Sequence, residues 1–164
     1  MATLYRRLTQ REPNDVPVAL VASGFAHKET DPDLPTALRL NMTGHDEDPR
    51  VESERYQAAL EMASFAEANQ FSVVSVEEHH CAENGWLPSP LTLAAGIIGR
   101  TQTIAVNCTA LLVTLYDPIR LAEEIAVLDL MSGGRFSFVA GLGYRPTEYA
   151  ALDKDWATRG ARMD

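Results

Sequence analysis

Two carboxylates and two imidazoles follow one another directly after an apolar run in the middle of the chain. The β-branched residues of the run 73–76 favour a pleated, buried strand. The four polar residues that come next are Glu77, Glu78, His79 and His80. In parallel α/β folds the carboxyl ends of the strands form the floor of the binding crevice. We therefore expect the chemistry of this protein at the end of this strand.

These four polar residues have two interpretations: a group that transfers protons, or a structural cluster. Imidazole has an unperturbed pKa of about 6.5, so it can give or take a proton near neutral pH. A cluster that only hydrogen-bonds backbone groups is the alternative. A zinc site is disfavoured, because adjacent histidines on an extended segment point to opposite faces and no further ligand spacing completes a set.

Composition limits the class of protein. The chain has 164 residues, 46% of them hydrophobic, which is enough for one globular domain with a core. Its net charge of −9 disfavours nucleic acid as a partner. Cys81 and Cys108 lack metal-ligand spacing and indicate reduced thiols, as in a cytoplasmic protein. No apolar run is long enough to span a bilayer, so we expect no membrane partner.

The first part of the chain differs from the rest. Residues 1–35 carry mixed charge and four prolines, and we predict an N-terminal extension there. Arg6 and Arg7 precede a modest apolar run at 16–26, a weak export-signal pattern. Because Pro17 and Gly24 interrupt that run, an irregular leader is the favoured interpretation.

Strands and helices alternate through residues 36–164. We predict strands at 36–43, 71–77, 103–108 (extending toward 112) and 135–140, and helices at 50–69, 89–100, 117–133 and from 146 toward 152. This alternation indicates parallel pairing with right-handed crossovers. Four such units fit an open doubly wound sheet or half of an eight-stranded barrel, which needs about 250 residues in full. We predict an α/β fold of the (β/α)8 TIM-barrel type, with about the first four units present.

Several motifs in register resemble one family, the bacterial luciferase-like flavin monooxygenases. The resemblance runs from about Leu38 to the C-terminus, and its motifs are Glu78-His79-His80, Ser89-Pro90 and the segments 109–112, 116–124 and 128–136. It implies the N-terminal half of a (β/α)8 barrel that holds reduced FMN, or the deazaflavin F420 in a sister branch. It also implies a homodimer and a flavin reductase as the supplier of reduced flavin.

The resemblance assigns roles to the ends of the second and third strands. It implies that His79 lies beside the flavin and assists proton transfer, with Glu78 orienting or charge-stabilising the His79 ring. It implies that Thr109, Ala110 and Leu111 bind the cofactor, with a non-prolyl cis bond between Ala110 and Leu111. An ordinary trans strand end is the alternative, because nothing local demands a cis bond.

The loop after the fourth strand is the other expected cofactor contact. The resemblance implies that Gly141, Gly143 and Tyr144 border the flavin, whereas a plain strand-to-helix turn is the alternative reading. The sequence departs from the family at Leu142: the family has an arginine at this position, which holds the FMN phosphate. Arg145, three residues later, could substitute for it. This departure keeps F420 open. Trp86 and Tyr144 could wall the site or simply pack within their loops.

The resulting prediction is a flavin-dependent monooxygenase that uses reduced FMN and oxygen on a small organic substrate. An F420-dependent hydride-transfer oxidoreductase is one alternative. A non-catalytic flavin-binding module and a self-associating half-barrel with no activity of its own are the others. No metal is expected, and the sequence does not identify the substrate.

Overall fold

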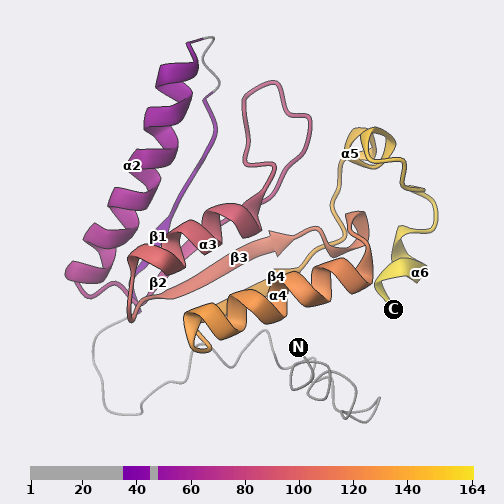
Figure 1. The fold of residues 1–164 in the computed structure, drawn as a ribbon. Helices are drawn as coiled ribbons and strands as arrows, with labels where there is room; N and C mark the ends of the chain where they lie inside the picture. Colours follow the sequence, from indigo (N-terminus) through magenta and orange to yellow (C-terminus); the bar gives the residue numbers. More distant parts are fainter. Residues whose placement is uncertain (1–34, 45–47) are drawn as a thin grey trace. The chain divides into compact units, whose positions relative to one another are not determined.

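The computed structural model describes residues 35–44 and 48–164. The predicted N-terminal extension, with its weak export-signal pattern, therefore lies outside the described residues except for residue 35. Strands β1 (Ala37–Arg39), β2 (Val73–Val76), β3 (Ala105–Leu111) and β4 (Phe136–Ala140) alternate with helices α2 (Pro49–Ala68), α3 (Pro90–Arg100) and α4 (Pro118–Ser132) (Figure 1). A 3-10 turn, η2 (Val113–Leu115), and two short helices, α5 (Pro146–Ala151) and α6 (Arg159–Met163), complete the chain. None of the described helices has both the length and the apolarity to cross a bilayer.

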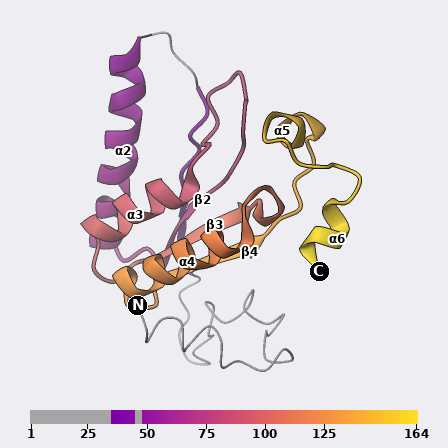
Figure 2. The same cartoon turned by 45° about the vertical axis from the view of Figure 1, so that its right-hand side comes forward.

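The four strands form one parallel sheet in the order β1-β2-β3-β4. Helices α2, α3 and α4 follow one another along one face of this sheet, as two views of the ribbon agree (Figures 1 and 2). The predicted alternation and parallel pairing are therefore confirmed. The first strand is shorter than predicted, because its ladder ends where the backbone N–H of Leu40 donates to the carbonyl of Ser75 at 2.9 Å.

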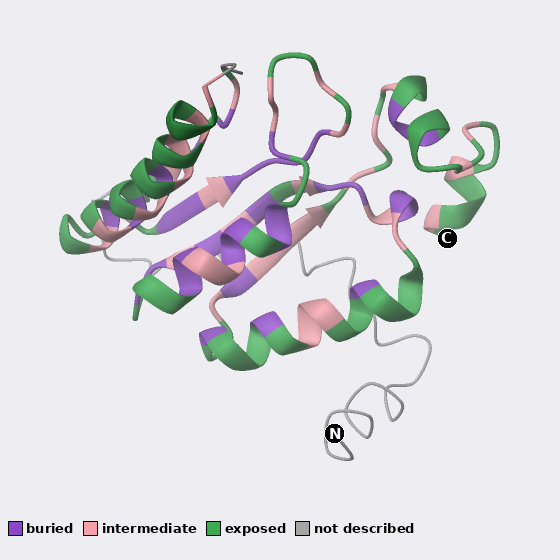
Figure 3. Ribbon diagram, turned by 45° about the horizontal axis from the view of Figure 1, so that its top comes forward, coloured by how far each residue is buried: buried purple, intermediate pink, exposed green. Residues whose placement is uncertain are grey.

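The hydrophobic core lies between the sheet and these helices. The β-branched and small residues of the strands alternate, so that Val74, Val76, Val106 and Cys108 are all buried on the helix side. The face of α3 that meets them is buried, while the outer faces of α2 and α4 are largely exposed (Figure 3). Burial, together with the charge of Glu78, raises the pKa of the Cys108 thiol, so this cysteine is a small core residue rather than a nucleophile.

Helix ends follow the sequence only in part. Asp117 caps α4 by accepting from the backbone N–H groups of Ile119 and Arg120, and Gly133 ends that helix with φ +65°, both as predicted. Ser89 makes no cap bond to α3, because its hydroxyl pairs with Thr92 at 2.7 Å instead.

The left-handed residue after α2 is Gln70, with φ +62°, and not Asn69 as predicted. The side chain of Asn69 donates to the carbonyl of Phe65 at 2.8 Å, and its backbone N–H also bonds within the last turn of the helix. These bonds hold Asn69 close to the helical conformation, so the chain reverses one residue later.

A carboxylate at the end of α2 fixes the connection between α3 and β3. Glu67 Oε1 accepts from the backbone N–H groups of Thr103 (2.6 Å), Gln102 (2.8 Å) and Ile104 (3.0 Å), and from the Thr103 hydroxyl (3.0 Å). These hydrogen bonds, the one from Thr103 first, lower the pKa of Glu67 to about 2. Glu67 thereby joins the C-terminal end of α2 to the start of β3.

Candidate functional site

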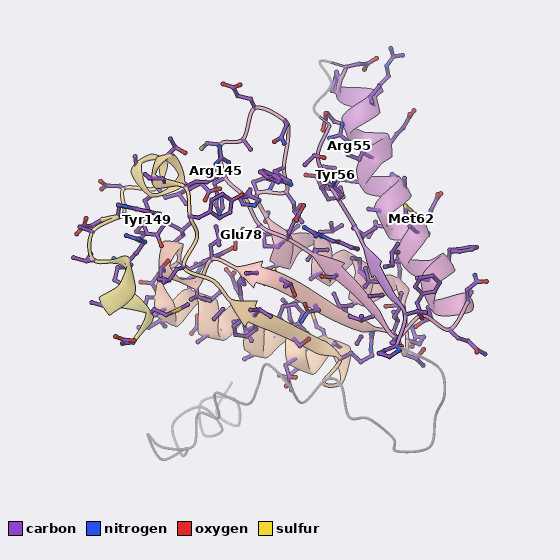
Figure 4. The ribbon with its side chains drawn as sticks, turned by 180° about the vertical axis from the view of Figure 1, so that it is seen from behind. Arg55, Tyr56, Met62, Glu78, Arg145 and Tyr149 are labelled. Atoms are coloured by element: carbon purple, nitrogen blue, oxygen red, sulfur yellow. The ribbon has the colours of Figure 1, made fainter. Side chains whose placement is uncertain are left out.

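The predicted site residues come together because the strands are parallel. Residues 77–80 leave β2, residues 109–111 end β3, and residues 141–144 leave β4, all at the same edge of the sheet. Figure 4 labels Glu78 from the segment after β2 and Arg145 from the loop after β4. The structure therefore places the polar residues after β2 on the same rim as the ends of β3 and β4.

Glu78 is a buried carboxylate with three partners. Its Oε2 accepts from the backbone N–H of Leu112 at 2.6 Å, and its Oε1 accepts from the Tyr116 hydroxyl at 2.5 Å and lies 2.8 Å from His80 Nε2. Burial and the Glu78 carboxylate raise the pKa of Tyr116, so its hydroxyl keeps the proton that it donates. Glu78 therefore binds β2 to the segment after β3, and its imidazole partner is His80 rather than the predicted His79.

The imidazole of His79 is held on three sides. Its Nδ1 lies 3.0 Å from Glu148 Oε1, its ring stacks on Trp86 with centroids 3.9 Å apart, and the ring of Tyr144 meets it edge-on at 5.6 Å. The backbone N–H of His79 donates to the carbonyl of Leu87 at 3.0 Å. Among the described residues Nε2 has no hydrogen-bond partner, and it is not fully buried. This nitrogen is therefore the one available to a bound molecule.

Glu148 is a site residue that the sequence analysis missed. Its side chain is 0% exposed, and Oε1 receives the His79 ring, the backbone N–H of His80 at 3.1 Å and Arg145 Nη1 at 3.4 Å. Oε2 is buried and unpartnered within the part of the chain that the structure describes. The only signal in the sequence is Pro146, which opens α5 and so places an acid in its first turn.

A row of polar side chains crosses the sheet on the face opposite α2, α3 and α4. Strand register places its four members at one level, and each alternates with a buried core residue along its own strand. Asn107 Nδ2 donates to the Ser137 hydroxyl at 2.9 Å within this row. The four are Arg39, Ser75, Asn107 and Ser137.

Glu77 lies one level closer to the rim than this row. It is buried, forms a salt bridge with Arg39, and accepts from Trp86 Nε1 at 2.9 Å. The same bond fixes the indole that stacks on His79. The inner face of the sheet is thus polar up to the rim, which fits a face that contacts a ligand better than one that fills a core.

The end of β3 carries a cis peptide bond between Thr109 and Ala110, one residue earlier than predicted. The ladder with β4 shifts at this point: Thr109 pairs with Val139 and Leu111 pairs with Ala140, so Ala110 has no partner in the register. Leu111 is buried in the core, so the irregular part of the strand ends at Ala110.

Gly141 lies directly against this strand end. A Cβ on Gly141 would stand 2.8 Å from the Cβ of Ala110 and 3.4 Å from Leu112 Cδ2, so no larger residue fits without a shift. The backbone N–H of Gly141 donates to the carbonyl of Leu111 at 2.8 Å. Ala110 and Gly141, predicted separately, are therefore one surface of small residues.

In the rest of the loop after β4, some side chains are exposed and one forms a hydrogen bond within the protein. Gly143 has φ +74°, and the Tyr144 side chain is exposed at the rim. Leu142, where an arginine was expected, is also exposed. Arg145, the substitute that we considered for a phosphate contact, has its guanidinium directed at the buried Glu148.

The rim has the features that a planar aromatic cofactor requires. Ala110 and Gly141 are small, half-buried residues that pack against each other, and Thr109 is exposed beside them. Tyr144 and Trp86 supply aromatic walls around His79. The residues present therefore fit a flavin ring, with apolar walls and a few polar groups. No cluster of His, Cys, Asp and Glu among the described residues could hold a metal ion.

Comparison with known proteins agrees with this geometry. A family model described as luciferase-like monooxygenase matches residues 39–164. The alkanal monooxygenase beta chain of Vibrio harveyi is 34% identical over 89 residues, which are 54% of this chain and 28% of that protein. The chain spans about a third of the length of the curated relatives that it matches.

Two solved structures have the same fold. The monooxygenase RslO1 from Streptomyces bottropensis superposes with a TM-score of 0.70 at 26% identity, over 79% of this chain and 39% of that one. The oxygenating constituent of 3,6-diketocamphane monooxygenase from Pseudomonas putida, in complex with FMN, has a TM-score of 0.64 at 20% identity, over 73% and 32% of the two chains. The four β/α units described above are thus part of a barrel of this type.

Proposed function

The chain belongs to the luciferase-like monooxygenase family, and from this premise we propose that it supplies the flavin-binding rim of a monooxygenase that acts on a small organic substrate. The observation that carries the proposal is the placement of His79. Its free Nε2 lies on the same rim as the small-residue surface of Ala110 and Gly141. FMN is the favoured cofactor, because it is bound in one of the structures with this fold.

The residues of the rim divide the binding task. Ala110 and Gly141 would lie under the ring, because both are small and half-exposed where β3 and β4 end. Thr109 and Tyr144 would border it, since both are exposed next to that surface. When bound, reduced flavin supplies the electrons with which oxygen is activated, and the protein orients it and excludes water.

His79 would move the proton that such chemistry requires. Its ring stacks on Trp86, meets Tyr144 edge-on and is bonded to Glu148 through Nδ1, so Nε2 keeps a fixed direction. Nε2 is the ring nitrogen that has no partner among the described residues, so it is the atom at which the imidazole would exchange that proton. Glu78 has no direct part in this step, because its hydrogen bonds go to His80, Leu112 and Tyr116.

Cofactor identity can be tested by titrating the purified chain with FMN and, separately, with F420. Quenching of flavin fluorescence and perturbed visible absorbance with FMN are expected. Binding of F420 alone would favour the hydride-transfer alternative. That alternative stays open because position 142 is leucine where an arginine was expected, and because Arg145 is bonded to Glu148. A chain that binds neither cofactor would refute both proposals.

The proposed role of His79 can be separated from flavin binding by His79→Ala. The variant should bind FMN with an affinity within about threefold of the parent and should lower kcat about 10²-fold, as expected for loss of a general acid–base group. Oxygen uptake in the presence of a reductase that supplies reduced FMN measures turnover. Unchanged turnover would remove the catalytic role, and a chain that binds flavin without turnover would be a binding module.

A further inference from the structure

A buried carboxylate that no sequence motif pointed to stands directly behind His79. Glu148 has no exposed surface, and three groups converge on its Oε1: His79 Nδ1 at 3.0 Å, the backbone N–H of His80 at 3.1 Å and Arg145 Nη1 at 3.4 Å. A structural acid at the start of a short helix would need none of the contacts to the loop after β2. The bonds join α5 to that loop across β3.

The partners of Oε1 determine which atom of the His79 bond carries the proton. A backbone N–H and a guanidinium can only donate, so Oε1 already serves as an acceptor for two groups. The third bond then has its proton on Nδ1 of His79. Neutral imidazole carries one ring proton, so Nε2 is left with its lone pair, and Nε2 is the nitrogen without a partner among the described residues.

The second oxygen of Glu148 takes no part in these bonds. Oε2 is buried and has no partner in the described part of the chain, and Arg145 reaches only Oε1, at the long distance of 3.4 Å. The imidazole therefore meets the one oxygen of Glu148 on which the other two donors also converge. When Nε2 takes up a proton, the positive charge that forms on the ring lies against this carboxylate.

We propose that Glu148 is a positioning residue that fixes His79 as the Nδ1–H tautomer, so that Nε2 faces the rim as a proton acceptor. The inference rests on the proposed function for its catalytic meaning, since His79 is the group that would touch the reacting molecule. Trp86 and Tyr144 restrict the ring by contact, whereas Glu148 determines its protonation. The arrangement is a carboxylate–imidazole pair whose members come from α5, after β4, and from the loop after β2. The strands β2 and β4 are not neighbours in the sheet.

The tautomer can be read directly from two-bond ¹H–¹⁵N correlation spectra of the ¹⁵N-labelled chain, with the His79 signals assigned by their absence in His79→Ala. The parent should show the Nδ1–H pattern, and Glu148→Gln, which keeps an acceptor oxygen, should retain it. Glu148→Ala should shift His79 toward the Nε2–H form. Glu123→Ala, a change at an exposed acid of α4, is the control and should leave the spectrum unchanged.

The same variants distinguish this inference from the proposed function. Glu148→Ala should lower kcat about 10²-fold and leave the flavin affinity within about twofold, with partial rescue in Glu148→Gln. An Nε2–H pattern in the parent would overturn the inference even if no variant folds, as would an unchanged tautomer in Glu148→Ala. If the tautomers are as expected but His79→Ala leaves turnover unchanged, the catalytic role of His79 is refuted, whereas the Glu148–His79 pair still stands.

Discussion

Replacing Glu67 with glutamine should reveal how strongly one carboxylate holds the start of β3 in place. Glu67 Oε1 accepts from three backbone N–H groups and one hydroxyl of the connection 102–104. Glutamine keeps an acceptor oxygen of the same shape but removes the charge. The three N–H groups would then bond to a neutral acceptor, which is a weaker partner than a carboxylate.

The magnitude follows from the pKa of Glu67, which falls from 4.5 to about 2 in the folded chain. At about 1.36 kcal/mol for each pH unit, this change corresponds to about 3.4 kcal/mol of free energy of unfolding. Because the carboxylate is largely in contact with water, screening reduces the contribution, and we expect Glu67→Gln to cost about 1–2 kcal/mol at pH 7.

The pH dependence provides the discriminating measurement. A depressed folded-state pKa stabilises the protein above the unfolded-state value of 4.5, and the stabilisation is lost as pH falls toward about 2. Urea unfolding should therefore show a difference between the parent and Glu67→Gln that falls to about half near pH 3. Glu61→Gln, at an exposed position of the same helix, is the matched control and should change little at either pH. Equal differences at pH 7 and pH 3 would refute the electrostatic explanation.

Two further substitutions test the rim. Gly141→Ala would place a Cβ 2.8 Å from the Cβ of Ala110 and should lower the free energy of unfolding by about 1–3 kcal/mol. Gly99→Ala, in a helix with nothing within 4 Å of the new atom, should raise it by up to about 1 kcal/mol; similar urea midpoints for the two would contradict the packing argument. Tyr116→Phe removes a donor to the buried Glu78 and should cost about 1–3 kcal/mol, so an unchanged urea midpoint would mean that this hydrogen bond contributes nothing.

The sequence was sufficient for the fold because its signals are local. Apolar periodicity and the cap at Asp117 determine where α4 begins, and the β-branched run of β2 determines a strand. Parallel pairing then brings all strand ends to one edge, so the convergence of residues 77–80, 109–111 and 141–144 followed from alternation alone.

The parts of the site that could not be predicted depend on contacts between distant loops. The burial of Glu148 and its bond to His79 join residues 69 positions apart, and no pattern in either segment signals the other. The exchange of partners, in which Glu78 bonds His80 rather than His79, has the same origin. The cis bond before Ala110 coincides with a shift in the register between β3 and β4, and the sequence of the third strand does not by itself indicate that shift.

The polar row of Arg39, Ser75, Asn107 and Ser137 also bears on how this sheet tolerates substitution. These side chains come from four different strands and stand at one height, so each can be exchanged without altering the pairing of its neighbours. The helix-facing residues next to them in sequence carry the core instead. Substitutions in this row can therefore change the polar face of the sheet one position at a time while the helix-facing core stays intact.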